Sequence, residues 1–218
     1  MTADTSFVLR YFDLIGRAEG ARLLLTAGKA NWTEEHPEWP AEKDKQPFKR
    51  LPVLVEKSGE DEWILCESPA IERYLARKFG FFPADIKQAA EQEQLAEQQY
   101  DVVKAFFDKL LVPQEQLEKI GDGFDVLLDR IVEKHLHILE DSSHGYLFGD
   151  SMSYADISCY AFYKLFILYL PVYQPDIANV VISKITPSIS AFISLIESNP
   201  LLAPYVAESK SVAAALSK

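Results

Sequence analysis

Residues 52–78, PVLVEKSGEDEWILCESPAIERYLARK, decide the fold of the first part of the chain, because two strands, a turn and a helix follow one another there. The two apolar runs are short and flank a turn rich in Ser, Gly and Asp, which is the pattern of a β-hairpin. Serine is a favoured N-cap residue and proline suits the first helical position. The predicted strands are Pro52–Glu56 and Glu62–Leu65, the turn is Ser58–Asp61, and the helix runs from Ser68 to about Lys78.

Upstream of this hairpin, the sequence predicts a strand, a helix and a second strand. Phe7–Phe12 is a short apolar and aromatic run, and apolar residues recur at helical spacing from Arg17 to Ala27 before Gly28 ends the helix. Trp32–His36 is the second strand. Residues 37–40 contain two prolines and are expected to be an irregular loop. The order is therefore βαβ, an irregular segment, then ββα.

Strand signals end after residue 86, and the rest of the chain is predicted to be helical. Lys87–Leu111 contains no Gly or Pro, and apolar residues keep helical spacing from Leu127 to Asp141. Ser153-Tyr154-Ala155-Asp156 has the form of a capping box before another apolar helix. We expect an α/β domain over residues 1–82 and an all-α domain over residues 83–218.

Composition excludes several classes of function. The 218 residues carry a net charge of −11, which argues against binding to nucleic acid or to an anionic membrane. The most apolar stretch, Ile157–Tyr173, is shorter than the roughly 20 residues that span a bilayer and is expected to be a core helix. Two isolated cysteines and an N-terminus without a signal-peptide pattern fit a cytoplasmic protein.

Motifs for nucleotides, metals and serine nucleophiles are absent from the sequence. His135 and His137 lie two residues apart on a helix, so they face different directions. The other two histidines have no partner cluster. We therefore expect no metal and no cofactor.

Four placements remain as candidates for chemistry, each with a structural alternative. Tyr11 ends a strand before a turn, where functional groups are often exposed, although a core aromatic is favoured on the pattern alone. Pro52 precedes a strand and suits an unusual backbone shape if its peptide bond is cis, although trans is far more frequent. Glu67 and Ser68 stand at a helix N-terminus, which binds anions or is simply capped. In the irregular loop, Trp39 is either a hydrogen-bond donor to a ligand or a lid on the core; Lys43 stands beside it.

Taken together, these segments resemble the cytosolic glutathione transferases of the tyrosine type, especially the sigma, alpha and pi classes. The resemblance covers almost the whole chain and rests on five segments in family order. They are residues 9–19, residues 39–43, residues 51–54, the Glu67–Ala76 segment with its Ser-x-Ala-Ile-x-x-Tyr-Leu pattern, and the Gly149–Asp156 capping motif. The family fold that this implies is a thioredoxin-like first domain followed by a helical domain.

The resemblance also implies a role for each matched residue toward glutathione, which is a co-substrate. Tyr11 would donate a hydrogen bond to the glutathione sulfur, supported by Arg17. Leu51 would pair with the cysteinyl backbone beside a cis Pro52. The remaining implied contacts are Trp39 and Lys43 to the glycine carboxylate, Glu67 and Ser68 to the γ-glutamyl group, and Asp101 to the glutathione of a partner subunit.

The implied reaction is the addition of the glutathione thiolate to a small hydrophobic electrophile in a homodimer. The acceptor site is expected among Phe12, Leu14, Ala105 and Asp108, with the tail near Val212 and Leu216, although core packing also explains the apolar members. Two alternatives stay open. One is a glutathione-dependent lipid isomerase of the prostaglandin-D-synthase kind, and the other is a non-enzymatic crystallin-like or ligand-binding relative.

Overall fold

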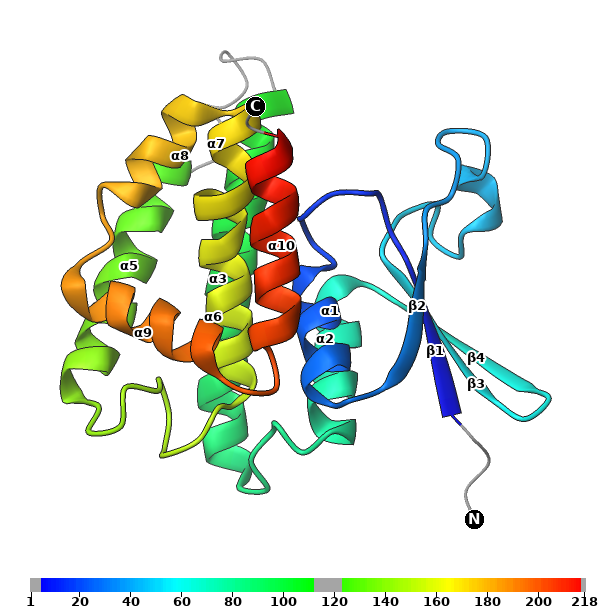
Figure 1. Ribbon diagram of the computed structural model, residues 1–218, viewed down its shortest axis with the longest axis horizontal. Coiled ribbons are helices and arrows are strands. Elements are labelled where there is room, and N and C mark those ends of the chain that lie inside the picture. Colours follow the sequence, from blue (N-terminus) through cyan, green and yellow to red (C-terminus); the bar gives the residue numbers. More distant parts are fainter. Residues whose placement is uncertain (1–4, 112–122, 217–218) are drawn as a thin grey trace.

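The computed structural model describes residues 5–111 and 123–216 of the chain, without the side chains of Leu111 and of residues 214–216. Its first part is an α/β domain and its second part is helical, which confirms the predicted fold class (Figure 1). The order of elements in the first domain is the predicted one, with a short 3-10 turn added. These elements are β1 (Thr5–Arg10), α1 (Glu19–Ala27), β2 (Asn31–Glu35), η1 (Lys43–Lys45), β3 (Val53–Ser58), β4 (Asp61–Cys66) and α2 (Ser68–Lys78).

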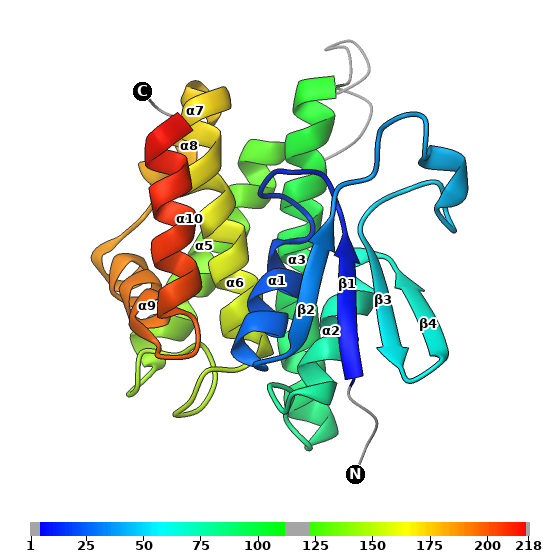
Figure 2. The same ribbon diagram turned by 45° about the vertical axis from the view of Figure 1, so that its right-hand side comes forward.

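The four strands form one sheet in the order β2-β1-β3-β4. β1 pairs parallel with β2 and antiparallel with β3, and β3 pairs antiparallel with β4 in the expected hairpin. Alternate residues of β1 point to opposite faces, so Phe7 and Leu9 join the main core while Val8 packs with Val53 and Val55 on the other face. Helices α1 and α2 lie between the sheet and the helical domain (Figure 2).

The helical domain is built around the long helix α3 and the buried helix α6. Because α6 is surrounded, nearly all of its residues are buried. The helix α10 lies beside α1, so the end of the chain returns to the first domain (Figure 1). The helices are α3 (Ile86–Leu111), α5 (Phe124–Asp141), α6 (Tyr154–Lys164), the π-helical turn η2 (Leu165–Tyr169), α7 (Leu170–Tyr173), α8 (Pro175–Ile182), α9 (Pro187–Ser198) and α10 (Ala203–Leu216).

The apolar segment at α6 is longer than the sequence suggested. Tyr154–Tyr173 forms 20 continuous residues with the length and composition of a membrane span, so the expectation that it is too short was wrong. The predicted capping box begins it, because Asp156 accepts hydrogen bonds from the backbone N–H and hydroxyl of Ser153. Of the apolar stretch, 67% is buried inside the helical domain, which supports a core helix.

Candidate functional site

The register of the sheet places three of the predicted site residues in one row. Arg10 pairs with Val53, and Val53 pairs with Cys66. Because both pairings are antiparallel, the residues one position beyond these pairs, Tyr11, Pro52 and Glu67, lie side by side at the same end of the sheet. Neighbouring strands lie about 4.8 Å apart, so this row spans roughly 10 Å across the end of the sheet.

Tyr11 is buried and its hydroxyl is held by the loop that follows β1. The backbone N–H of Arg17 donates to the Tyr11 hydroxyl oxygen at 3.0 Å. Burial raises the pKa of Tyr11, against the smaller opposing effects of this N–H and of the charges of Arg22 and Arg17. The hydroxyl therefore keeps its proton near neutral pH. Since its oxygen is already an acceptor, that proton is left to donate to a ligand.

Gly16 lets this loop close over the tyrosine. A Cβ atom built at Gly16 would lie 2.8 Å from the Tyr11 hydroxyl, closer than real Cβ contacts come. Arg22 fixes the same loop from α1, because its guanidinium donates to the carbonyl oxygen of Leu14 at 3.1 Å and to that of Phe12 at 3.4 Å. It also lies over the Tyr11 ring at 5.6 Å. Neither Gly16 nor Arg22 was predicted from the sequence to be a site residue.

An aromatic chain links Tyr11 to the irregular loop. The Phe12 ring meets the Tyr11 ring and the Trp39 ring edge-on, each at 5.4 Å between centroids. Lys43 Nζ lies 6.0 Å from the Trp39 ring centroid. Trp39 is 38% exposed, so it is available to a ligand rather than serving as a buried lid. The Trp39–Pro40 and Leu51–Pro52 peptide bonds are both cis, and the family resemblance implied a cis bond only at Pro52.

Glu67 and Ser68 lie where β4 turns into α2. The helix begins at Ser68 with Glu67 at the capping position, one residue earlier than predicted, and Pro69 stands within its first turn. Glu67 has a left-handed backbone with φ of 69°, while Ser68 is 5% exposed. The first N–H groups of an 11-residue helix therefore open next to Pro52, and this end of the helix favours an anion.

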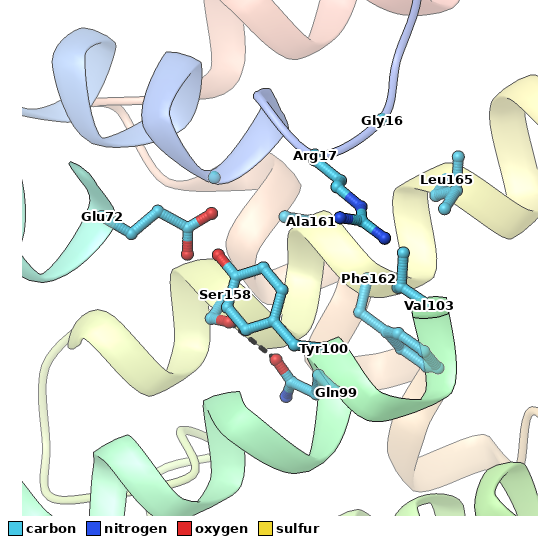
Figure 3. Close-up of a pocket in the computed structure, with 11 residues that line it drawn as sticks. Gly16, Arg17, Glu72, Gln99, Tyr100, Val103, Ser158, Ala161, Phe162 and Leu165 are labelled. Carbon is cyan, nitrogen blue, oxygen red and sulfur yellow. Dashed lines mark hydrogen bonds between the residues drawn. The ribbon is translucent and has the colours of Figure 1, made fainter. Parts of the chain in front are cut away.

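A small cavity lies between the two domains, and Gly16 and Arg17 of the loop that holds the Tyr11 hydroxyl line it (Figure 3). Its volume is about 40 Å³. One end is apolar, and Arg17 points toward it from the loop (Figure 3). The other end is polar, with the Tyr100 hydroxyl directed at the Glu72 carboxyl (Figure 3). The apolar end is lined by Val103, Phe162 and Leu165, and the polar end by Glu72, Gln99, Tyr100 and Ser158.

The polar end of the cavity contains a carboxyl group that the sequence analysis missed. Glu72 is 4% exposed, and burial raises its pKa to about 8. The carboxyl is therefore mostly neutral at pH 7. Ser158 donates to the Gln99 side chain at 2.7 Å. The sequence does contain a signal for Glu72. It precedes Leu75 by three residues and Ala76 by four on the same helix, so it lies on the apolar face of that helix.

The remaining predicted residues do not meet at one place. Asp101 is exposed on α3, and Asp108 pairs with Lys104 at 2.6 Å on the same helix. Phe12, Ala105 and Asp108 do not line the cavity of Figure 3. Leu14 and Val212 line a different cavity, and the side chain of Leu216 lies outside the described residues. Arg17 lies over the Phe107 ring at 5.5 Å, a contact that was not predicted.

Within residues 5–111 and 123–216, no three or more His, Cys, Asp or Glu side chains form a group that could hold a metal ion. His135 is buried in a polar cluster, between the Tyr163 hydroxyl at 3.0 Å and the Gln99 amide nitrogen at 3.1 Å. Burial lowers its pKa to about 3. Near the site, His36 Nδ1 donates to the Tyr11 carbonyl oxygen at 3.1 Å.

Fold and site together define a two-domain protein of the thioredoxin-like class, with a buried tyrosine hydroxyl just beyond the end of the inner strand β1 and a helix N-terminus in the same row. Family models for the glutathione S-transferase N-terminal and C-terminal domains match residues 7–77 and 79–209. Glutathione S-transferase 1 of Ascaris suum is 34% identical over 163 residues, which cover 69% of this chain and 75% of that protein. The chain belongs to the glutathione S-transferase family. The domain boundary after residue 82 stays a prediction.

Three further comparisons show the breadth of that family. S-crystallin 2 of Enteroctopus dofleini is 29% identical, covering 71% of this chain and 78% of that protein. The structure of NaGST-2 has a TM-score of 0.73 at 28% identity and covers 93% of this chain and 96% of its own. A glutathione S-transferase of the hookworm Necator americanus, Na-GST-3, described as monomeric, has a TM-score of 0.70 at 25% identity, covering 93% and 97%.

Proposed function

We propose that the protein adds the thiolate of glutathione to small hydrophobic electrophiles, with the Tyr11 hydroxyl as the donor to the sulfur. The observation that carries this is the orientation of the hydroxyl, whose oxygen accepts the Arg17 N–H and whose proton remains available. Lowering a thiol pKa by two units requires about 2.7 kcal/mol of preferential stabilisation of the thiolate. A hydrogen bond to a charged group is worth about 1.5–3 kcal/mol.

Glutathione is proposed to lie along the row at the end of the sheet. Its γ-glutamyl carboxylate sits at the N-terminus of α2, where Glu67 accepts from the ammonium group and Ser68 donates to the carboxylate. Its cysteinyl unit pairs with the backbone of Leu51, which lies outside the β3–β4 ladder pairs. Its glycine carboxylate reaches Trp39 and Lys43. No further cofactor is needed, since glutathione supplies the nucleophile.

The acceptor is proposed to enter at the apolar end of the cavity beside Gly16. This end is close to the Tyr11 hydroxyl, as the short distance from Gly16 shows, and Val103, Phe162 and Leu165 supply apolar walls. Arg17 lies at the same end, where it can stabilise a developing negative charge on the acceptor. The earlier candidates Phe12, Leu14, Ala105 and Asp108 stay predictions as the outer part of this site.

The homodimer and the cytoplasmic location also remain proposals. Support for a dimer comes from the large apolar side chains that the first domain exposes, above all Phe48 at 64%, with Trp63 at 46%. Sedimentation at micromolar concentration checks this. A monomer, as Na-GST-3 is described, would remove the dimer and the role of Asp101 while leaving the glutathione site intact.

The test of the proposed function is Tyr11→Phe, which removes the hydroxyl and keeps the ring. We expect glutathione binding to change little, the pKa of the bound thiol to rise toward that of free glutathione, and turnover at pH 7 to fall about ten- to a thousandfold. The thiolate absorbance of bound glutathione, titrated against pH, reports this without knowledge of the acceptor. Tyr173→Phe, at an exposed tyrosine away from this cavity, is the matched control. An unshifted titration in Tyr11→Phe would show that another group activates the sulfur.

The crystallin-like alternative is favoured by one observation, the similarity to S-crystallin 2. It predicts no turnover with any electrophile although the protein folds. The lipid-isomerase alternative predicts rearrangement of a lipid endoperoxide with glutathione present and not consumed. One panel of electrophiles and endoperoxides, scored both for loss of glutathione and for rearrangement of the endoperoxide, separates the three alternatives.

A further inference from the structure

A second and larger cavity lies on the other side of the loop between β1 and α1. Its volume is about 590 Å³, within the range of about 300–1,000 Å³ that small-molecule sites occupy. It is bounded by the β1–α1 loop, β2, the η2–α7 turn and α10, and it shares no lining residue with the cavity of Figure 3. It is therefore a different cavity from that of Figure 3, although it contains Leu14 and Val212, which the sequence placed near the acceptor.

Every charge at the floor of this cavity is already matched. Glu19 binds Lys164 at 2.5 Å and Arg22 at 3.1 Å. Arg22 also binds Glu34 at 2.5 Å. The two carboxylates and the two cations of this group therefore neutralise one another. Tyr205 donates its hydroxyl to Glu19 at 3.0 Å. A ligand that enters the cavity consequently finds no unpaired cation at the floor to recognise an anion.

The walls are aromatic. Trp32 lies on β2, and Tyr169 and Tyr173 lie on the η2–α7 turn. The two tyrosine rings are 4.5 Å apart between centroids and 34° from parallel, and Tyr173 is 49% exposed. Ring faces of this kind attract cations within about 6 Å of their centroids.

The rim adds negative charge from two sides. Asp13 belongs to the β1–α1 loop and Glu208 to α10, and both line the cavity and are exposed. Neither has an ion-pair partner elsewhere in the part of the chain that the structure describes. The net charge of the lining, with Lys164 included, is therefore −2, from Asp13 and Glu208.

We propose that this cavity binds an organic cation, with the ammonium group between the Asp13 and Glu208 carboxylates and the apolar part against Trp32, Tyr169 and Tyr173. The binding involves no covalent step and does not depend on the proposed transferase reaction. It explains why aromatic rings and unpaired carboxylates meet around a cavity whose internal charges are neutralised.

The probe is benzyltrimethylammonium, titrated into the full-length protein by calorimetry at low salt, with benzenesulfonate as an anion of similar size. We expect a dissociation constant of about 1 mM for the cation, no binding of the anion, and weaker binding as salt is raised. Saturating glutathione should leave the affinity for the cation unchanged. Competition between the two would place the cation at the Tyr11 site and overturn the proposal.

The double variant Asp13→Asn with Glu208→Gln removes both rim charges without changing shape. It should weaken the binding of benzyltrimethylammonium about tenfold. The matched control, Glu60→Gln with Asp61→Asn, makes the same change in net charge at the exposed β3–β4 turn, and should leave the affinity as it was. Tyr173→Leu should weaken binding several-fold through the loss of a ring. An equal effect of the two double variants, or no binding by the unmodified protein, would refute the site.

Discussion

Two buried carboxyl groups at the interface between the domains behave in opposite ways. Glu19 on α1 and Glu72 on α2 are 1% and 4% exposed. Burial by itself raises the pKa of Glu19, but Lys164 and Arg22 outweigh it and the pKa lies below its ordinary value. In the part of the chain that the structure describes, no cation forms an ion pair with Glu72, and burial outweighs the charge of Arg73 and raises the pKa of Glu72 to about 8. Burial alone therefore does not decide whether a carboxyl group in this interface is charged.

The largest effect is expected from breaking the ion pair at Glu19. Lys164→Met keeps the apolar stem and removes the ammonium group, which leaves a buried carboxylate short of one partner. We expect a loss of about 3–5 kcal/mol in the free energy of unfolding, measured by urea denaturation at pH 7. Lys210→Met, at an exposed ion pair on α10, serves as the control and should stay within about 1 kcal/mol. A loss below about 1 kcal/mol for Lys164→Met would mean that the pair does not hold the interface.

The second prediction concerns the pH dependence that Glu72 gives to stability. Its folded pKa is raised, so the folded state holds a proton that the unfolded state releases above about pH 4.5, and stability falls as pH rises toward 8. Between pH 5 and 7 this group alone should remove about 3 kcal/mol. Glu72→Gln should remove that part of the slope, which urea denaturation at several pH values measures in both proteins.

Glu19 gives stability a pH dependence of the opposite sign. Its folded pKa is lowered, so its contribution to stability is present above about pH 4.5 and is lost as pH falls further. Glu72→Gln should therefore leave the acid limb of the stability curve unchanged. Equal slopes in both proteins between pH 5 and 7 would show that Glu72 is already ionised in the folded state.

The third prediction uses the close approach of Gly20 to Glu72. A Cβ atom at Gly20 would overlap a Glu72 carboxyl oxygen, so Gly20→Ala should destabilise the protein by about 1–3 kcal/mol. In the Glu72→Ala background the clash is gone, and the same change should stabilise by up to about 1 kcal/mol through helix propensity. A double-mutant cycle measured by thermal unfolding should show this reversal of sign. Additive effects would place the Glu72 side chain elsewhere.

The smallest effect on stability is expected at an exposed ion pair between β1 and β2. Arg10 binds Glu35 at 2.8 Å, with the Glu35 side chain 53% exposed. Glu35→Gln should change the free energy of unfolding by less than about 1 kcal/mol, and high salt should reduce the difference further. A change as large as that of Lys164→Met would contradict the distinction between buried and exposed pairs.

The sequence was sufficient for features that depend on neighbours along the chain. The hairpin at Ser58–Asp61, the helix from Ser68 and the capping box at Ser153 each follow from a few adjacent residues, and the structure confirms the elements, with α2 capped one residue earlier than expected. Strand ends moved by one or two residues, so that β1 stops at Arg10 and Tyr11 lies just beyond it. The family resemblance supplied the candidate residues of the glutathione site.

The features that the sequence could not supply depend on residues far apart in the chain. Nothing near Lys164 in the sequence indicates its role, because its partner Glu19 is 145 positions away. The pKa of Glu72 depends on packing against α1 and α3, and the cavity between Asp13 and Glu208 exists only once α10 returns to the first domain. A pattern of neighbouring residues cannot predict contacts between residues so far apart in the chain.

The contact between α10 and α1 also forms late during synthesis of the chain. Glu19 and Tyr205 are separated by 186 residues, so the hydroxyl that donates to Glu19 leaves the ribosome long after α1 has been made. At about 5–20 residues per second, that interval is roughly 10–40 s. During that interval the Glu19 carboxylate lacks one of its hydrogen-bond donors, because Tyr205 has yet to be made. A ribosome stalled before α10 therefore holds a nascent chain in which α1 still lacks its contact with Tyr205.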